Sequence, residues 1–318
     1  MLTIKQFKEK YILSEAKGSG YDDEHATVSL WNHVIGHPKQ RQFLKSHQAI
    51  KDEIQKARTD KKHPLNFANA TTGFTGGKKP HHEESYYREL EHAAGTVHGL
   101  ANHPEFQDAV KVKAKAKVSG ASRGKLSDTW KNSGAKNATS KADIEIGERG
   151  EEHHKTVSLK KGDSQLMSAQ PEEFHATYEH ATTAHMQAND KFTDEHKKSV
   201  MDRIVKVRKH LASMANATPE KQRKHRDKAQ KIMNQIHDEH PDLLSHIHHE
   251  ASTGHGKFGH HQEGTARFLV TSGSESAHVH DTETQHEPIV AGRPRIALPK
   301  GTGRPGNVKI DYRAIKEK

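Results

Sequence analysis

The stretch that decides the fold runs from residue 138 to residue 168 and reads ATSKADIEIGERGEEHHKTVSLKKGDSQLMS. ADIEI (142–146) alternates small or apolar residues with acids, and KTVSLKK (155–161) alternates apolar with polar residues. A period of two is typical of β-strands. The charged loop GERGEEHH (147–154) lies between them, so the pattern predicts two short strands joined by a surface hairpin.

The two strands carry a set of side chains suited to phosphate chemistry. Residues two apart share one face of a strand, so Asp143 is expected beside Glu145, and Ser158 beside Lys160. If the strands pair in register, an acidic pair and a lysine meet at one point. That is the minimal set needed to hold a divalent metal against a phosphate.

The composition limits how large a core the chain can build. Of the 318 residues, 31% are hydrophobic, 5% aromatic and 29% charged, so we expect a compact centre with long polar helices and mobile connections. No apolar run has the length of a membrane span, and the N-terminus lacks the apolar core of a signal peptide. The absence of cysteine excludes disulfides and thiolate metal sites, and is compatible with a reducing cytosol.

The charge distribution favours a polyanionic partner, of which nucleic acid is the commonest. The formal net charge is +10 with histidine neutral. Nine basic residues lie between residues 111 and 141, against the single acid Asp128. This basic segment leads directly into the strand that carries Asp143, as a site that cuts phosphodiesters requires.

Histidine is abundant, with 29 residues that include four HH pairs. The HEE sequence at His82 and the HE pair at His249 lack a second histidine at the spacing of a zinc-binding HExxH helix. We therefore interpret the histidines as a composition bias at surface polar positions.

Apolar spacing and helix-breaking residues predict helices at 1–17, 21–35, 38–58, 83–100 and from Pro171, followed by two long polar helices at 194–214 and from Pro219. The segment 110–118 (VKVKAKAKV) fits an exposed strand by its period and a helix by its composition, and both readings stay open. Residues 265–272 predict the most apolar strand of the C-terminal half, and 293–306 a basic linker.

These elements predict an α+β fold with an α/β-like core, in which a small mixed central sheet is flanked by helices. We expect four parts: an N-terminal helical region (1–105), a core (106–190), a long polar helical hairpin inserted into it (191–250), and C-terminal strands with a basic tail (251–318) that complete the sheet.

Three pieces of sequence now point to one family. TSKADIEIG, HKTVSLKKGDSQLMS and EASTGHGKFG followed by a strand resemble bacteriophage proteins with the restriction-endonuclease-like fold of the PD-(D/E)xK superfamily. The resemblance covers roughly residues 125–272. It implies a metal-dependent DNA endonuclease, located in the host cytoplasm or in the virion.

The resemblance also implies roles for individual residues. In that superfamily an acid on one strand and an acid-x-lysine on the next hold magnesium, and the lysine orients or deprotonates the attacking water. Asp143 matches the first acid and Lys160 the lysine, while Gln165 sits where some members place a polar residue near the substrate. Ser158 stands where the second acid is expected. The metal shell would then need Glu145, Glu24 from an N-terminal helix, or water.

DNA is the expected partner, and a homodimer is compatible with the sequence. The basic residues expected to contact DNA are Arg123, Lys125, Lys131, Lys136, Lys141, Lys161 and Lys257. Two other functions remain open. One is a non-catalytic DNA-binding virion or genome-processing protein that keeps a degenerate nuclease fold, which the Ser158 departure favours. The other is nucleotidyl transfer, because Ser133-Gly134 followed by Asp143-Ile144-Glu145 loosely matches a GS…DxE pattern.

Overall fold

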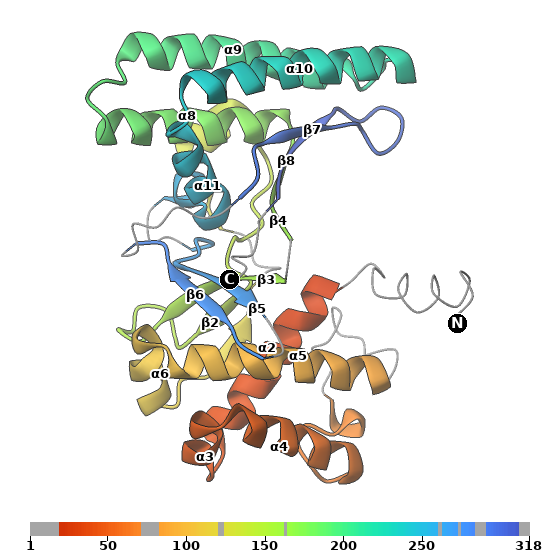
Figure 1. Ribbon diagram of the computed structural model, residues 1–318, viewed down its shortest axis with the longest axis vertical. Coiled ribbons are helices and arrows are strands. Elements are labelled where there is room, and N and C mark those ends of the chain that lie inside the picture. Colours follow the sequence, from red (N-terminus) through yellow and green to blue (C-terminus); the bar gives the residue numbers. More distant parts are fainter. Residues whose placement is uncertain are drawn as a thin grey trace. The chain divides into compact units, whose positions relative to one another are not determined.

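The computed structural model describes residues 19–70, 83–119, 124–161, 164–259, 263–272, 275–283 and 291–311. Over these residues the chain is mixed α+β, with a small mixed sheet flanked by helices, as the sequence predicts (Figure 1). The helix expected at 1–17 and the basic residue Arg123 lie outside the described residues.

The described helices are α2 (Ser19–Gly36), α3 (Gln40–Lys45), α4 (His47–Thr59), η2 (Phe67–Asn69), α5 (Glu83–Asn102), η3 (Pro104–Phe106), α6 (Gln107–Lys111), α7 (Asp128–Ser133), α8 (Pro171–Ala188), α9 (Asp194–Ser213), α10 (Pro219–Glu239), α11 (Leu243–Thr253) and α12 (His255–Phe258). The strands are β1 (Ala116–Val118), β2 (Ile144–Ile146), β3 (Lys155–Lys161), β4 (Gln165–Ala169), β5 (Phe268–Ser272), β6 (His278–Asp281), β7 (Arg295–Ala297) and β8 (Asn307–Asp311). Among the described helices, none combines the length and the apolar character needed to cross a membrane.

The strands form a five-stranded sheet in the order β1-β2-β3-β5-β6 and a three-stranded sheet in the order β4-β8-β7. The chain divides into two compact units. Unit 1 comprises Met1–Val118, Ile144–Lys155 and Val270–Val279, and unit 2 comprises Ser119–Asp143, Thr156–Leu269 and His280–Lys318. Both units are thus assembled from segments far apart in the sequence, and the four-part division expected from the sequence stays a prediction.

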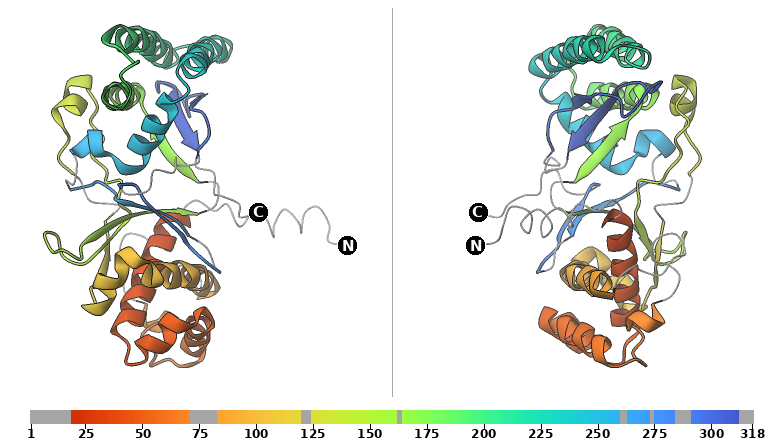
Figure 2. Two further views of the ribbon diagram at one scale, coloured as in Figure 1. Left: turned by 60° about the vertical axis from the view of Figure 1, so that its left-hand side comes forward. Right: turned by 90° about the vertical axis from the view of Figure 1, so that its right-hand side faces the viewer.

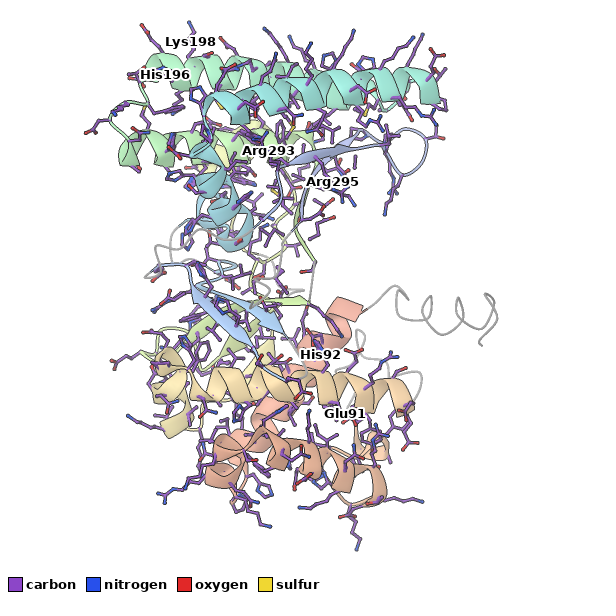
Figure 3. The ribbon with its side chains drawn as sticks, in the orientation of Figure 1. Glu91, His92, His196, Lys198, Arg293 and Arg295 are labelled. Atoms are coloured by element: carbon purple, nitrogen blue, oxygen red, sulfur yellow. The ribbon has the colours of Figure 1, made fainter. Side chains whose placement is uncertain are left out.

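Unit 1 is built around α2, α4 and α5, which pack on one another. The helix α4 begins at Ser46, whose hydroxyl accepts a hydrogen bond from the Ala49 N–H (3.3 Å) and so caps the first turn. Ile50 and Ile54, one turn apart on α4, are fully buried, because a spacing of four places them on one helix face. On α5, Glu91 (labelled in Figure 3) accepts a hydrogen bond from Arg58 of α4 (3.1 Å).

The segment 110–118 is neither one strand nor one helix. The helix α6 ends at Lys111, Lys113 adopts a positive φ of 55° in the turn that follows, and β1 begins at Ala116. β1 pairs antiparallel with β2, and Ala116 lies opposite Ile146. The Asn32 side chain on α2 binds both the N–H (2.7 Å) and the carbonyl (3.0 Å) of Ala116, so β1 pairs with a strand on one edge and with a side chain on the other.

Unit 2 stacks α8, α9 and α10 side by side (Figure 2). The helix predicted at 194–214 is confirmed as α9, and its apolar residues Val200, Ile204, Val207 and Leu211 form one fully buried stripe. The predicted helix starts are confirmed too: the Thr218 hydroxyl caps α10, with Pro219 in its first turn, and a capping box at Gln170 begins α8.

The three-stranded sheet of unit 2 corrects two expectations. Residues 165–169, expected only to lead into a helix, form β4, which pairs antiparallel with β8. The supposed linker at 293–306 contains β7, which pairs antiparallel with the opposite edge of β8. Two arginines hold this region: Arg293 pairs with Asp238 (2.7 Å) and Arg295 with Asp311 (2.6 Å; Figure 3).

A buried histidine makes unit 2 sensitive to acid. His237 on α10 is fully buried, lies 2.8 Å from the Tyr178 hydroxyl, and has its pKa lowered from 6.5 to about 4, mainly by loss of hydration and also by Arg293. Between those two pKa values the unfolded chain binds a proton that the folded chain does not. The free energy of unfolding therefore falls as the pH falls through this window.

From pH 7 to pH 4 we expect this one residue to lower the free energy of unfolding by about 3 kcal/mol, at roughly 1.4 kcal/mol per pKa unit. Urea unfolding at both pH values measures it. The variant His237→Gln should lose this part of the pH dependence, and an unchanged dependence in the variant would contradict the assignment to His237.

Candidate functional site

Asp143, Ser158 and Lys160 meet within unit 2. The backbone N–H of Asp143 donates to the Val157 carbonyl (2.8 Å), which aligns Asp143 with β3. Ser158 and Lys160 share a face of β3 because they are two residues apart. Lys160 Nζ lies 3.3 Å from Asp143 Oδ2 and 2.6 Å from Ser158 Oγ. The structure therefore joins the acid, the hydroxyl and the lysine that the sequence singles out.

The two oxygens of the Asp143 carboxylate have different surroundings. Oδ2 accepts hydrogen bonds from the Leu159 N–H (2.7 Å), the Ser158 hydroxyl (3.0 Å) and Lys160 Nζ (3.3 Å). Oδ1 has no hydrogen-bond partner among the residues that the structure describes. Three donors hold the carboxylate in place, and the second oxygen can accept a cation or a water molecule.

These side chains line a cavity of about 210 Å³ in unit 2. Its charged lining consists of three lysines and three acids: Lys141, Lys160, Lys257, Asp143, Glu173 and Glu250. The volume lies below the size of ordinary pockets for larger organic ligands. The cavity can hold a phosphate group.

A buried ionic network forms the inner wall of the cavity. Glu250 on α11 is 2% exposed and accepts hydrogen bonds from the backbone N–H groups of Gly256 (2.7 Å) and Lys257 (3.2 Å). Lys257, 4% exposed, contacts the Thr139 carbonyl through Nζ (3.1 Å). Lys141 Nζ donates to the Ala251 carbonyl (2.7 Å).

The backbone turn at Gly254 makes this arrangement possible. Gly254 ends α11 in the left-handed region, with φ of 70°, where residues with a Cβ are strained. A Cβ there would lie 2.7 Å from Cγ of Lys141. The turn thus brings Lys141 close to the backbone at Gly254 and directs the N–H groups of residues 256 and 257 at Glu250.

Burial dominates the electrostatics of this wall. Loss of hydration raises the pKa of Glu250 and lowers the pKa of both Lys141 and Lys257, because each charged form loses water. The hydrogen bonds and the opposite charges within the network counteract these shifts. Keeping these buried side chains charged therefore costs free energy. A bound anion or cation would strongly change the electrostatic free energy of the network.

The other acids proposed for the metal shell belong to unit 1. Glu145 lies on β2 and already contacts three basic side chains: Arg149 (3.2 Å), His154 (3.3 Å) and Lys117 (3.6 Å). The hydrogen bond from His154 is the main reason that the pKa of Glu145 is lowered. Glu24 is half-buried on α2.

The remaining predicted residues occupy different positions in unit 2. Gln165 is exposed at the start of β4 and is not part of the cavity lining. Among the predicted DNA contacts, Lys125, Lys131 and Lys136 are exposed and Lys161 is half-buried. Lys141 and Lys257 instead line the cavity itself.

Sequence reasoning missed two acids of the cavity, Glu173 and Glu250. Glu173 was read only as one of the acids that favour the start of α8, and its carboxylate does accept a hydrogen bond from the Gln170 N–H (3.3 Å). Its other oxygen lies 3.8 Å from Lys257 Nζ. No local pattern marks Glu250, which reaches the cavity because α11 packs on β4 and α8.

A separate cluster in unit 1 could hold a metal ion. His33, Glu53 and His63 each offer a ligand atom, and these atoms all lie within 4.8 Å of one another. Over the described part of the chain, this is the one group of three such side chains with that spacing. Interpreting all the histidines as surface positions was therefore wrong for these two, whose side chains are 8% and 10% exposed beside a buried glutamate, as it was for the fully buried His237.

Comparisons with known proteins do not place the chain in a family. We found no family model, no curated protein and no solved structure that matches it. Its function must therefore be argued from the geometry of its own residues.

Proposed function

We propose that the cavity of unit 2 is the active site of a metal-dependent DNA endonuclease of bacteriophage type, with a restriction-endonuclease-like core into which α9 and α10 are inserted. The observation that carries this proposal is the convergence of Asp143, Ser158 and Lys160, with Lys160 Nζ 3.3 Å from the carboxylate and 2.6 Å from the hydroxyl. An acid and a lysine on neighbouring strands are what phosphodiester hydrolysis in that superfamily requires.

The cavity offers magnesium a hard oxygen ligand. Asp143 offers Oδ1, and Glu173 and Glu250 lie in the same lining, although the three carboxylates do not all come within 4.8 Å of one another. Magnesium prefers hard oxygen ligands, binds through one or two carboxylates and keeps several waters, for which the cavity has room. When bound, the metal would polarise the phosphate and lower the pKa of a coordinated water.

Each nearby side chain has a distinct task in this proposal. Lys160 neutralises negative charge that develops on the phosphate and orients the attacking water. Ser158, only 2% exposed, accepts a hydrogen bond from Lys160 and donates one to Asp143, and so keeps both groups in place. The exposed Lys125, Lys131 and Lys136 contact DNA phosphates outside the cavity.

One observation favours a second candidate, a DNA-binding protein without catalysis. Ser158 replaces the expected acid, and Lys160 already pairs with Asp143. An acid and a lysine that already pair with each other can be a structural remnant of an active site. The basic surface would then bind DNA while the cavity performs no chemistry.

One direct experiment distinguishes the endonuclease from the non-catalytic DNA-binding protein. Supercoiled plasmid and labelled linear DNA are incubated with the purified chain and Mg²⁺, Mn²⁺, Ca²⁺ or EDTA. We expect cleavage with Mg²⁺ or Mn²⁺ and none with EDTA. Binding without cleavage in all four conditions would support the non-catalytic role. In either case the affinity should fall steeply as salt rises, because contacts with phosphates release counterions.

A further inference from the structure

Three histidines of unit 1 converge on one oxygen atom of Glu53. Oε1 of Glu53, on α4, lies 3.0 Å from His63 Nε2, 3.4 Å from His33 Nε2 and 3.7 Å from His37 Nε2. His33 lies on α2, His37 directly follows the end of α2, and His63 lies in the loop after α4. The cluster is distinct from the cavity of unit 2 and has no part in the proposed function.

The spacing of these atoms matches a tetrahedral metal site. Ligand atoms that surround a zinc ion tetrahedrally at 2.0–2.1 Å are about 3.3–3.4 Å from one another. The distances from Glu53 Oε1 to His63 Nε2 and His33 Nε2, 3.0 and 3.4 Å, are close to this value, and the ligand atoms of these three residues all lie within 4.8 Å of one another. We therefore infer that His33, Glu53 and His63 form a zinc site that ties α2, α4 and the loop after α4 together, with His37 beside it.

The chemistry of the ligands selects the metal class. Two imidazole nitrogens and one carboxylate suit zinc, whereas magnesium takes oxygen ligands almost exclusively. The site is also enclosed, since the side chains of His33, Glu53 and His63 are only 8–10% exposed. His37 is more open, at 24%, and provides the entry side for the ion.

The surroundings hold the ligands in position. The ring of Phe43 packs against His37, with centroids 5.0 Å apart, and against His33 at 6.4 Å. In the loop, the backbone N–H of His63 donates to the Asp60 carbonyl (3.0 Å), and the Asn66 N–H donates to the His63 carbonyl (2.9 Å). Two helices and one hydrogen-bonded turn thus orient the site before metal binds.

One hydrogen bond must change when zinc binds. Nδ1 of His63 accepts from the Leu65 N–H (3.1 Å). In this arrangement the neutral ring carries its proton on Nε2, which points at Glu53. Coordination through Nε2 moves that proton to Nδ1, so the Leu65 amide loses its acceptor. The amide resonance of Leu65 should therefore shift on metal binding.

The test uses the full chain without an affinity tag, stripped with EDTA and then dialysed against zinc. The comparison is between a His33→Asn/His63→Asn variant and a control, His210→Asn/His225→Asn. The control removes an equally close histidine pair of unit 2, with Nδ1 atoms 3.0 Å apart. Metal analysis, calorimetry and thermal unfolding are measured for all three proteins.

We expect one tightly held zinc per chain in the wild type and the control, a higher melting temperature with zinc than with EDTA, and loss of both effects in the cluster variant. Cobalt in place of zinc should give the intense visible spectrum of a tetrahedral site in the wild type, which is a readout that does not depend on how well the variant folds. Equal zinc binding by the wild type and the cluster variant, or wild-type cobalt with an octahedral spectrum, would overturn the inference.

Discussion

Replacing Asp143 with asparagine is expected to lower the rate of metal-dependent DNA cleavage by about a thousandfold or more. The substitution keeps the size of the side chain and lets it still accept hydrogen bonds from the Leu159 N–H and the Ser158 hydroxyl. It removes the negative charge on the oxygen that would face the metal. Binding of DNA should change little, because the exposed lysines outside the cavity supply most of that affinity.

Lys160→Met should have a similar effect on the rate for a different reason. The methionine has nearly the same length as the lysine but cannot neutralise the phosphate or orient a water. Single-turnover cleavage at saturating protein measures the chemical step for both variants. Asp128→Asn is the matched control, because Asp128 is an exposed acid that pairs with Lys131 (3.1 Å). Wild-type rates in Asp143→Asn and Lys160→Met together would remove the assigned site.

The meeting of Asp143, Ser158 and Lys160 was predictable because it depends on local rules. Alternation along β3 places Ser158 and Lys160 on one face, and a single strand register brings Asp143 alongside them. The buried stripe of α9 and the starts of α8 and α10 followed from equally local signals: helical spacing, a capping residue and a proline.

The acids Glu173 and Glu250 were not predictable in the same way. They reach the cavity from α8 and α11, and only the packing of those helices on β4 decides which of their residues face it. The short strands β4 and β7 were missed for a related reason. They have too few residues to show a period of two, and both depend on pairing with β8, which for β4 lies at the far end of the chain.

The histidine cluster was predictable from the sequence only in part. His33 lies on the helix predicted at 21–35, and this part of the arrangement is one that local reasoning can recognise. Glu53 and His63 come from the next helix and its following loop, and no periodic pattern links them to α2. Because the chain has 29 histidines, this local signal alone could not identify the cluster.

Replacing Glu250 with alanine is expected to lower the free energy of unfolding of unit 2 by about 3–5 kcal/mol, the usual cost of removing one partner from a buried ionic network. Glu250 is 2% exposed, and its loss leaves Lys257, 4% exposed, and the adjacent Lys141 with less negative charge to offset them. It also leaves the N–H groups of Gly256 and Lys257 without their acceptor.

The measurement can isolate unit 2 because the chain has two tryptophans, one in each unit: Trp31 in unit 1 and Trp130 in unit 2. In a Trp31→Phe background, urea unfolding followed by Trp130 fluorescence reports on unit 2. Glu172→Ala is the matched control, since Glu172 is a partly exposed acid on α8 that pairs with Arg208 (3.4 Å) and should contribute at most about 1 kcal/mol.

A second variant distinguishes loss of charge balance from loss of packing. Glu250→Gln/Lys257→Met removes one charge of each sign while keeping the side-chain volumes similar, so it should recover much of the stability that Glu250→Ala loses. If the double variant is as unstable as Glu250→Ala, the network stabilises unit 2 through its backbone hydrogen bonds instead of through its charges. A Glu250→Ala chain with the stability of the Glu172→Ala control would show that the buried charges of the cavity wall are not coupled to folding at all.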